Sequence, residues 1–96
     1  MAAQYFVQKS TGSSLKKAFL KAREDALYEH GHGGYTGTLA EKDSVKLIET
    51  VDSLDVAFDR AEDFVNDPRV DDTWGPAGAI HVKDTDIYVF FGWASS

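Results

Sequence analysis

The sequence predicts a small α+β domain in which two helices and several strands share one hydrophobic core. Two helical patterns alternate with short aromatic and β-branched segments, and the order strand–helix–strand occurs twice. The chain has 96 residues, which is enough for one core and too few for two. Hydrophobic residues make up 43% of it, the proportion of a folded globule. We therefore expect a single domain over residues 1–96.

The first predicted strand and helix occupy the N-terminal third of the chain. Residues 5–8 are aromatic and β-branched, which favours a strand, and a Ser/Thr/Gly cluster ends it. Ser13 or Ser14 can cap the helix that follows, because a serine hydroxyl accepts a hydrogen bond from first-turn amides. The apolar residues that recur at helical spacing up to Glu29 are Leu15, Ala18, Phe19, Ala22 and Ala26.

The two ends of this helix carry different signals. Lys16 and Lys17 fall in its first turn, where positive charge opposes the helix dipole, so charge does not explain where the helix begins. Glycines at 31, 33 and 34 break the helical pattern. Residues 36–41 then read as the second strand.

The second half of the chain predicts a strand, a helix and two further strands. Residues 45–50 form the third strand, and Ser53 caps a second helix over residues 54–65. The buried stripe of that helix consists of Leu54, Ala57, Phe58, Ala61, Phe64 and Val65. A proline at 68 ends it, and residues 79–82 and 87–93 form the last two strands.

The last strand is apolar on both of its faces. Ile87, Val89, Phe91 and Trp93 alternate with Tyr88 and Phe90. Such a strand is either covered on both sides or joined to the sheet of a partner. Tyr88 and Phe90 are therefore candidate interface residues.

An internal sequence repeat, called the echo below, relates the two halves of the chain. Ser14-Leu15-x-x-Ala18-Phe19-x-x-Ala22 returns as Ser53-Leu54-x-x-Ala57-Phe58-x-x-Ala61, and Gly34-x-x-Gly37-x-Leu39-x-x-Lys42-Asp43 returns as Gly75-x-x-Gly78-x-Ile80-x-x-Lys83-Asp84. The two matches keep the same order along the chain. They predict two strand–helix–strand halves, about 4–43 and 44–84, followed by a C-terminal strand at 86–93.

Two such halves in one sheet predict a ferredoxin-like βαββαβ sandwich with an additional C-terminal strand. In that arrangement both helices cover one face of an antiparallel sheet. The other face would be bare and would carry aromatic side chains, which is typical of an interface or a ligand platform. We therefore expect a homo-oligomer.

The stretch from His30 to Thr38 is the candidate ligand-binding loop. It contains four of the eight glycines and two of the three histidines. Its glycines follow a helix and precede a strand, so neither the phosphate-loop nor the dinucleotide pattern is met. Gly34 and Gly37 have echoes at 75 and 78, which indicates a role in loop geometry. His30, His32, Tyr35 and Thr36 have none, and they are the candidate ligand-binding residues.

The sequence of this loop supports metal binding and catalysis less than it supports ligand binding. His30-x-His32 could supply two imidazoles, with Glu29, Glu41 or His81 as further ligands, but no third ligand is fixed by the sequence. His81 falls in a strand, which favours a structural role. No serine lies in a nucleophile elbow, and nothing orients Thr36 or Thr38 toward a base. We predict no metal site and no cofactor, and we favour a binding protein over an enzyme.

Charge and composition restrict the classes of partner. The net charge of −6 disfavours general attachment to nucleic acid. There is no cysteine, no signal-peptide pattern and no apolar run long enough to cross a membrane. Acidic residues run from the second helix into the loop around Trp74. That run would suit a basic partner, and Trp74, if exposed, is the expected contact residue.

Two phrases carry a resemblance to known proteins. Residues 28–42 (YEHGHGGYTGTLAEK) and 74–80 (WGPAGAI) resemble small uncharacterised proteins encoded by bacteriophages. The resemblance implies a phage accessory protein that acts in the cytoplasm of a bacterial host. It transfers no catalytic residue.

These observations lead to one function hypothesis and one alternative from another class. The first is a non-catalytic accessory protein that binds a bacterial host protein or sequesters a small, nucleotide-like signal molecule. The alternative is a small metal-dependent hydrolase or nucleotide-binding protein that uses the loop from His30 to Thr38.

Overall fold

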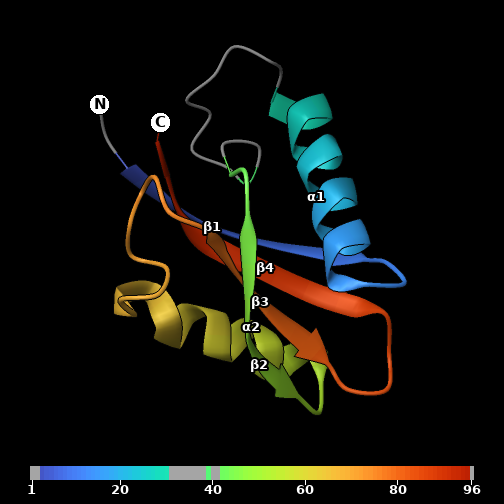
Figure 1. Ribbon diagram of the computed structural model, residues 1–96. Helices are drawn as coiled ribbons and strands as arrows, with labels where there is room; N and C mark the ends of the chain where they lie inside the picture. Colours follow the sequence, from blue (N-terminus) through green and yellow to red (C-terminus); the bar gives the residue numbers. More distant parts are fainter. Residues whose placement is uncertain (1–2, 31–38, 40–41, 96) are drawn as a thin grey trace.

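The computed structural model describes residues 3–30, 39 and 42–95 (Figure 1). Its elements, in chain order, are β1 (Ala3–Thr11), α1 (Leu15–His30), β2 (Val45–Val51), α2 (Leu54–Asp63), the short 3₁₀ helix η2 (Phe64–Asn66), β3 (Ala77–Val82) and β4 (Ile87–Ser95). Both predicted helices and four of the five predicted strands are present. The predicted strand over 36–41 lies outside the described residues, apart from Leu39.

The four described strands form one mixed sheet in the order β1-β4-β3-β2. β4 pairs antiparallel with β1 on one side and with β3 on the other. β2 and β3 are parallel, as α2 carries the chain from one to the other. The α+β prediction is therefore confirmed at the level of a small mixed sheet with two helices.

The ferredoxin-like arrangement is not confirmed. In a split strand–helix–strand unit another strand lies between the two strands that the helix connects. Here β2 and β3, which α2 connects, are direct neighbours and parallel, so the described sheet is not fully antiparallel. The sequence pattern identified the strands but held no signal for which of them pair.

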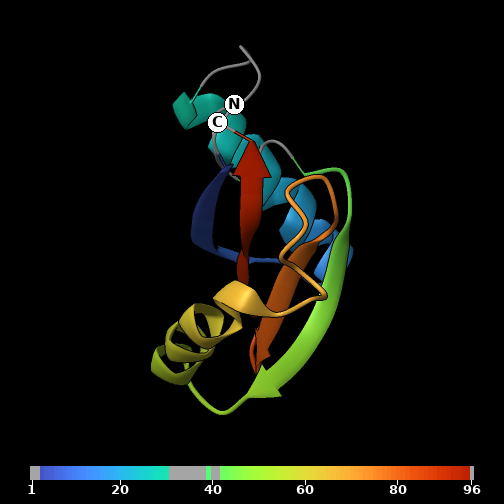
Figure 2. The same cartoon turned by 90° about the vertical axis from the view of Figure 1, so that its left-hand side faces the viewer.

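The expectation that both helices cover one face of the sheet is wrong. Phe90 of β4 packs with Phe19 of α1, whereas Val89 and Phe91 on either side of it pack with α2. Because successive strand residues point to opposite faces, α1 and α2 lie on opposite faces of the sheet. Figure 2 shows the sheet between the two helices. The double-sided apolar pattern of β4 therefore reflects cover by a helix on each side.

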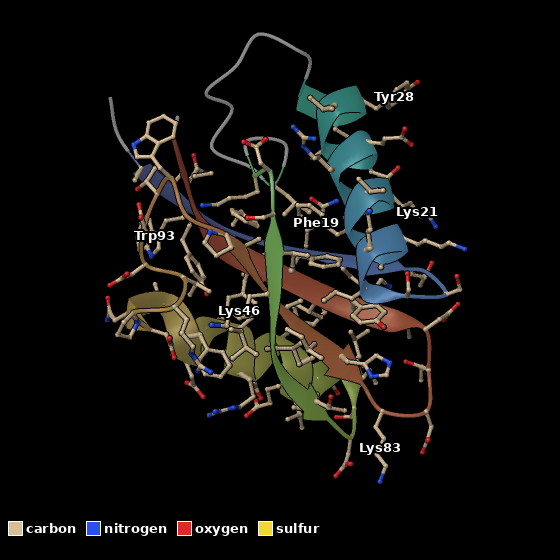
Figure 3. The ribbon with its side chains drawn as sticks, viewed as in Figure 1. Phe19, Lys21, Tyr28, Lys46, Lys83 and Trp93 are labelled. Atoms are coloured by element: carbon tan, nitrogen blue, oxygen red, sulfur yellow. The ribbon has the colours of Figure 1, made fainter. Side chains whose placement is uncertain are left out.

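The core beneath α1 depends on small helix residues. Ala18 and Ala22 are fully buried, and they let the helix approach β1 and β4 closely. Phe19 fills the remaining space, with its ring centroid 5.8 Å from that of Phe90 in a tilted pair. Figure 3 shows Phe19 extending from α1 toward the sheet.

The core beneath α2 follows the same design with a different aromatic residue. Ala57 and Ala61 are fully buried. Phe64, the first residue after α2, stacks on Phe91 with ring centroids 5.5 Å apart. The echo thus holds for the alanines but not for the aromatic position, because Phe58 is 37% exposed whereas its counterpart Phe19 is 4% exposed.

Both predicted helix caps are confirmed. The hydroxyl oxygen of Ser14 accepts a hydrogen bond from the amide of Lys17 at 3.2 Å. The hydroxyl oxygen of Ser53 accepts from the amide of Val56 at 3.3 Å. Each bond satisfies a first-turn amide that has no partner within the helix.

β2 contains a bulge. Its register against β3 shifts between Leu47 and Glu49, which leaves Ile48 as the extra residue. As a result Ile48 packs in the α2-side core while Glu49 reaches Arg60 of α2. Leu47, which precedes the bulge, is 45% exposed.

Replacing Gly78 by alanine is predicted to destabilise the fold. A β-carbon at Gly78 would lie 2.5 Å from Cζ of Phe91 and 2.8 Å from Cγ1 of Val70, and both side chains are fully buried. We expect Gly78→Ala to lower the free energy of unfolding by about 1–3 kcal/mol, the usual effect of overpacking. Chemical denaturation monitored by circular dichroism measures it.

Gly75→Ala is the matched comparison for this prediction. A β-carbon there would lie 3.1 Å from Cβ of Asp72, which is farther than the contacts at Gly78, and Asp72 is exposed rather than buried. A loss of stability in Gly75→Ala that equals or exceeds the loss in Gly78→Ala would contradict the packing argument.

Candidate functional site

The best-defined polar site in the described structure surrounds Lys42. Its side chain is 1% exposed, although lysine is rarely buried in proteins. The ammonium nitrogen Nζ donates to the backbone carbonyl oxygens of Thr73 at 2.9 Å, Gly75 at 3.0 Å and Asp72 at 3.3 Å. A lysine ammonium has three donors, so these three carbonyls match its full capacity.

This arrangement compensates the burial of a charge. Desolvation lowers the pKa of Lys42, while the negative charge of Asp72 opposes that shift. The bonds join two chain segments that are 30 to 33 residues apart in sequence. Lys42 therefore joins the segment that precedes β2 to the loop that precedes β3.

That loop, residues 67–76, is called the Trp74 loop below. Asp67 begins it and accepts three hydrogen bonds from Arg69, one from the backbone amide at 2.9 Å and two from the guanidinium at 2.9 and 2.8 Å. The side-chain bonds from Arg69 contribute most to holding the pKa of Asp67 down to about 2. The carbonyl of Asp67 accepts from the amide of Val70, a fully buried residue. The first half of the loop is therefore a fixed turn.

The second half of the Trp74 loop presents the tryptophan. The amide of Trp74 donates to Oδ1 of Asp72 at 2.9 Å, and the amide of Gly75 donates to the Asp72 carbonyl at 3.0 Å. These bonds and those from Lys42 fix the backbone on both sides of Trp74. Trp74 is nevertheless 68% exposed, so the condition on which its expected contact role depends is met.

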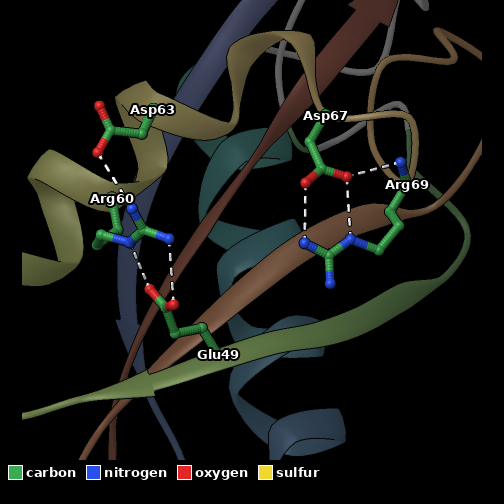
Figure 4. A network of polar contacts seen from close by, with 5 residues as sticks. All are labelled: Glu49, Arg60, Asp63, Asp67 and Arg69. Carbon is green, nitrogen blue, oxygen red and sulfur yellow. Dashed lines mark hydrogen bonds and ion pairs between the residues drawn. The ribbon is translucent and has the colours of Figure 1, made fainter.

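A network of ion pairs flanks the Trp74 loop (Figure 4). Arg60 of α2 donates to both carboxylate oxygens of Glu49 on β2, at 2.7 and 3.2 Å, and to Asp63 at 3.3 Å. The guanidinium carbons of Arg60 and Arg69 lie 4.8 and 5.6 Å from the ring centroid of Phe64. The network thereby connects β2, α2 and the loop around one buried aromatic ring.

Two aromatic side chains donate hydrogen bonds to backbone carbonyls at the C-terminal end of α2 and in η2, which follows it. The hydroxyl of Tyr5 donates to the carbonyl of Ala61, and Nε1 of Trp93 donates to the carbonyl of Val65 at 2.8 Å. Burial, with the nearby charge of Glu62, raises the pKa of Tyr5 to about 12. These donors satisfy carbonyls that the end of a helix leaves without intrahelical partners. Figure 3 shows Trp93 at this edge of the molecule.

The predicted ligand-binding residues fall mostly outside the described residues. His30 is the last residue of α1, and His32, Tyr35 and Thr36 lie beyond the described part of the chain. Of the further metal ligands considered, Glu29 is exposed on α1 and Glu41 is not described. The hypothesis of a site in this loop stays a prediction.

His81 has a structural environment. Its Nε2 lies 2.7 Å from the carbonyl oxygen of Thr85, and its ring stacks on Tyr88 with centroids 4.7 Å apart. Within residues 3–30, 39 and 42–95, no group of three or more histidine, aspartate and glutamate side chains is arranged to hold a metal ion.

The three predicted interface residues differ in their exposure. Trp74 is exposed and Tyr88 is half-buried. Phe90 is fully buried beneath Phe19, so its placement on a bare sheet face is wrong. The reason is that α1 covers the face which the predicted arrangement left open.

Lys42 was not predicted as a structural residue. The sequence identified it only as a position of the repeated pattern, and its echo partner Lys83 is exposed at the β3–β4 turn, where Figure 3 shows it pointing away from the protein. The two lysines precede an aspartate in the same pattern. Their different environments arise from tertiary contacts that this pattern does not encode.

No family model, no curated protein and no solved structure matches the chain. Among the described helices, none combines the length and the hydropathy needed to cross a membrane.

Replacing Lys42 by methionine is predicted to destabilise the protein and loosen the Trp74 loop. Methionine keeps the apolar stem but leaves three partly buried carbonyl oxygens without their donor, which costs about 1–3 kcal/mol in free energy of unfolding. Lys83→Met is the matched control, and as a surface change it should alter stability by no more than about 0.5 kcal/mol. Chemical denaturation gives both values, and equal values for the two variants would refute the role assigned to Lys42.

The Asp67–Arg69 turn is predicted to contribute pH-dependent stability. The pKa of Asp67 is about 2 in the folded protein against 3.8 as the ordinary value, so the folded state favours the carboxylate. This stabilisation is present above pH 3.8 and is lost as the pH falls through 2. Asp67→Asn should therefore be less stable than the wild type at neutral pH, with the difference shrinking in acid. Urea denaturation at several pH values tests this, and a constant difference would contradict it.

Proposed function

We propose that the chain is a non-catalytic binding protein that acts on a bacterial host protein, as expected of a phage accessory protein. The observation that carries this proposal is the presentation of Trp74, which is 68% exposed on a loop fixed by side-chain and backbone hydrogen bonds. Tryptophan is the residue type most often found at the energetic centre of protein interfaces. A loop that is already ordered loses little conformational entropy on binding.

The charges around Trp74 favour a partner with a basic surface. Asp71 and Asp72 precede it in the loop and are exposed, while Arg69 is held by Asp67. The acidic rim would steer a basic partner toward the tryptophan. Exposed charges of this kind mainly affect the association rate and its dependence on salt.

The described groups with clearly shifted pKa values support binding over catalysis. The pKa values of five groups are shifted, and each group is engaged in a backbone hydrogen bond or an ion pair: Tyr5, Lys42, Arg60, Asp67 and Arg69. Structural contacts account for these shifts without a reacting group. The described part of the chain thus supplies a contact residue more readily than an acid or a base.

A comparison of three proteins tests the proposal. Immobilised wild type, Trp74→Ala and Tyr28→Ala are exposed to a bacterial lysate, and captured proteins are identified by mass spectrometry. Tyr28 is the control because it is an aromatic residue that is 91% exposed on α1. We expect wild type and Tyr28→Ala to retain the same protein. Trp74→Ala should weaken its binding by about 2 kcal/mol or more, roughly thirty-fold in dissociation constant.

Titration of the captured protein at two salt concentrations then tests the acidic rim. Asp71→Asn should reduce the association rate at low salt and have less effect at high salt. The proposal fails if the wild type captures nothing beyond the bare resin, or if Trp74→Ala captures the same protein as strongly as the wild type.

A further inference from the structure

Two segments of this chain carry charge of opposite sign. Residues 9–23 contain five basic residues and no acidic one, whereas residues 52–72 contain eight acidic residues and two basic ones. The first segment leads into and forms the N-terminal half of α1, and the second contains α2. Because α1 and α2 lie on opposite faces, a basic patch over the N-terminal half of α1 and an acidic patch over α2 are on opposite faces of the sheet. They are called the basic side and the acidic side below.

The basic side contains an apolar groove. Leu15, Lys16, Phe19 and Leu20 of α1 and Asp43, Ser44 and Val45 before and at the start of β2 enclose a volume of about 340 Å³. Leu20 is 47% exposed at its rim, and Leu47, two residues beyond Val45 and so on the same face of the strand, is 45% exposed. Asp43 is the acidic residue of the groove, and Arg23 pairs with it at 3.4 Å.

The lysines beside this groove are placed against the preference of their helix. Lys16 and Lys17 lie in the first turn of α1, which contains no acidic residue. Positive charge at a helix N-terminus is unfavourable by about 0.3–1 kcal/mol for each residue. The positive charge at this rim therefore does not stabilise α1 through the helix dipole.

The acidic side contains an apolar residue with acidic neighbours. Phe58 of α2 is 37% exposed, whereas its neighbour Ala57 is buried. Asp55 and Glu62 stand three residues before and four residues after it, which places both beside it on the helix surface. Both are exposed. Phe58 thus has an acidic rim where the groove has a basic one.

We propose that these two surfaces bind each other between copies of the chain. Phe58 of one copy enters the groove between α1 and β2 of the next, where it contacts Leu20. Asp55 and Glu62 of the first copy then approach Lys16 and Lys17 of the second. Apolar burial supplies the attraction, and the opposite charges select the orientation.

The contact joins two different faces of the chain, so it is heterologous. Such a contact propagates from copy to copy, into a closed ring or an open filament, rather than stopping at a symmetric pair. Each copy has one groove and one Phe58. A substitution that blocks the groove or removes Phe58 therefore prevents association through that surface and leaves the other surface able to bind.

Analytical ultracentrifugation of two complementary variants tests this arrangement. Leu20→Glu blocks the groove with a negative charge, and Phe58→Ser removes the inserted ring. Wild type should form species larger than one chain as its concentration rises. Each variant alone should remain monomeric. Their equimolar mixture should form a complex of two chains and nothing larger, since Leu20→Glu retains Phe58 and Phe58→Ser retains the groove.

Two controls and one further condition complete the experiment. Val56→Ser changes an α2 residue that is 43% exposed, and Tyr28→Glu adds a negative charge to α1 away from the groove, so both should associate as the wild type does. In about 1 M salt, where the screening length is about 3 Å, wild-type association should weaken while the circular dichroism spectrum stays unchanged. Wild type that stays monomeric at every concentration, either blocking variant that associates normally, or a mixture that stays monomeric would overturn the proposal.

Discussion

The cover of β4 on both faces is the constraint that organises the described structure. This strand pairs with β1 and β3, and its alternate side chains enter two separate cores. Phe90 meets α1 while Phe91 meets α2 and η2. Each helix supplies buried alanines and one large aromatic ring beside it, so both layers reach close packing with few residue types. A domain of this size gains stability because one strand buries apolar area in two directions.

The polar interactions serve to hold loops against this core. Lys42 binds the carbonyls of the Trp74 loop, the Asp67–Arg69 turn begins that loop, and Glu49 with Arg60 joins β2 to α2. Exposed ion pairs contribute little to stability, whereas a buried ammonium with all its donors used determines one geometry. As a result, Trp74 is exposed on a loop whose backbone is fixed by hydrogen bonds. Rigidity and exposure together are what a contact residue requires.

Much of the secondary structure could be predicted from the sequence, because local signals determine it. Ser14 and Ser53 cap the helices, and the alanine spacing marks their buried faces. The sheet order could not be predicted, because strand pairing depends on contacts between segments far apart in the chain. The internal echo favoured equivalent halves, yet Lys42 is buried and Lys83 is exposed. Of the residues around the Trp74 loop, the sequence singled out Trp74 on the condition that it is exposed, and the structure shows that exposure. The role of Lys42 could not be predicted, because it depends on carbonyls 30 to 33 residues away in the chain.

The bulge in β2 has a consequence for how copies of the chain can meet. Among the described strands β2 is at an edge of the sheet, and an edge strand offers its free amides and carbonyls to any other extended chain. The extra residue at Ile48 interrupts the even spacing of those groups. A strand added there would need the same irregularity at the same position to pair along the full edge. The backbone of β2 therefore discourages sheet extension at this edge and the aggregation that follows from it.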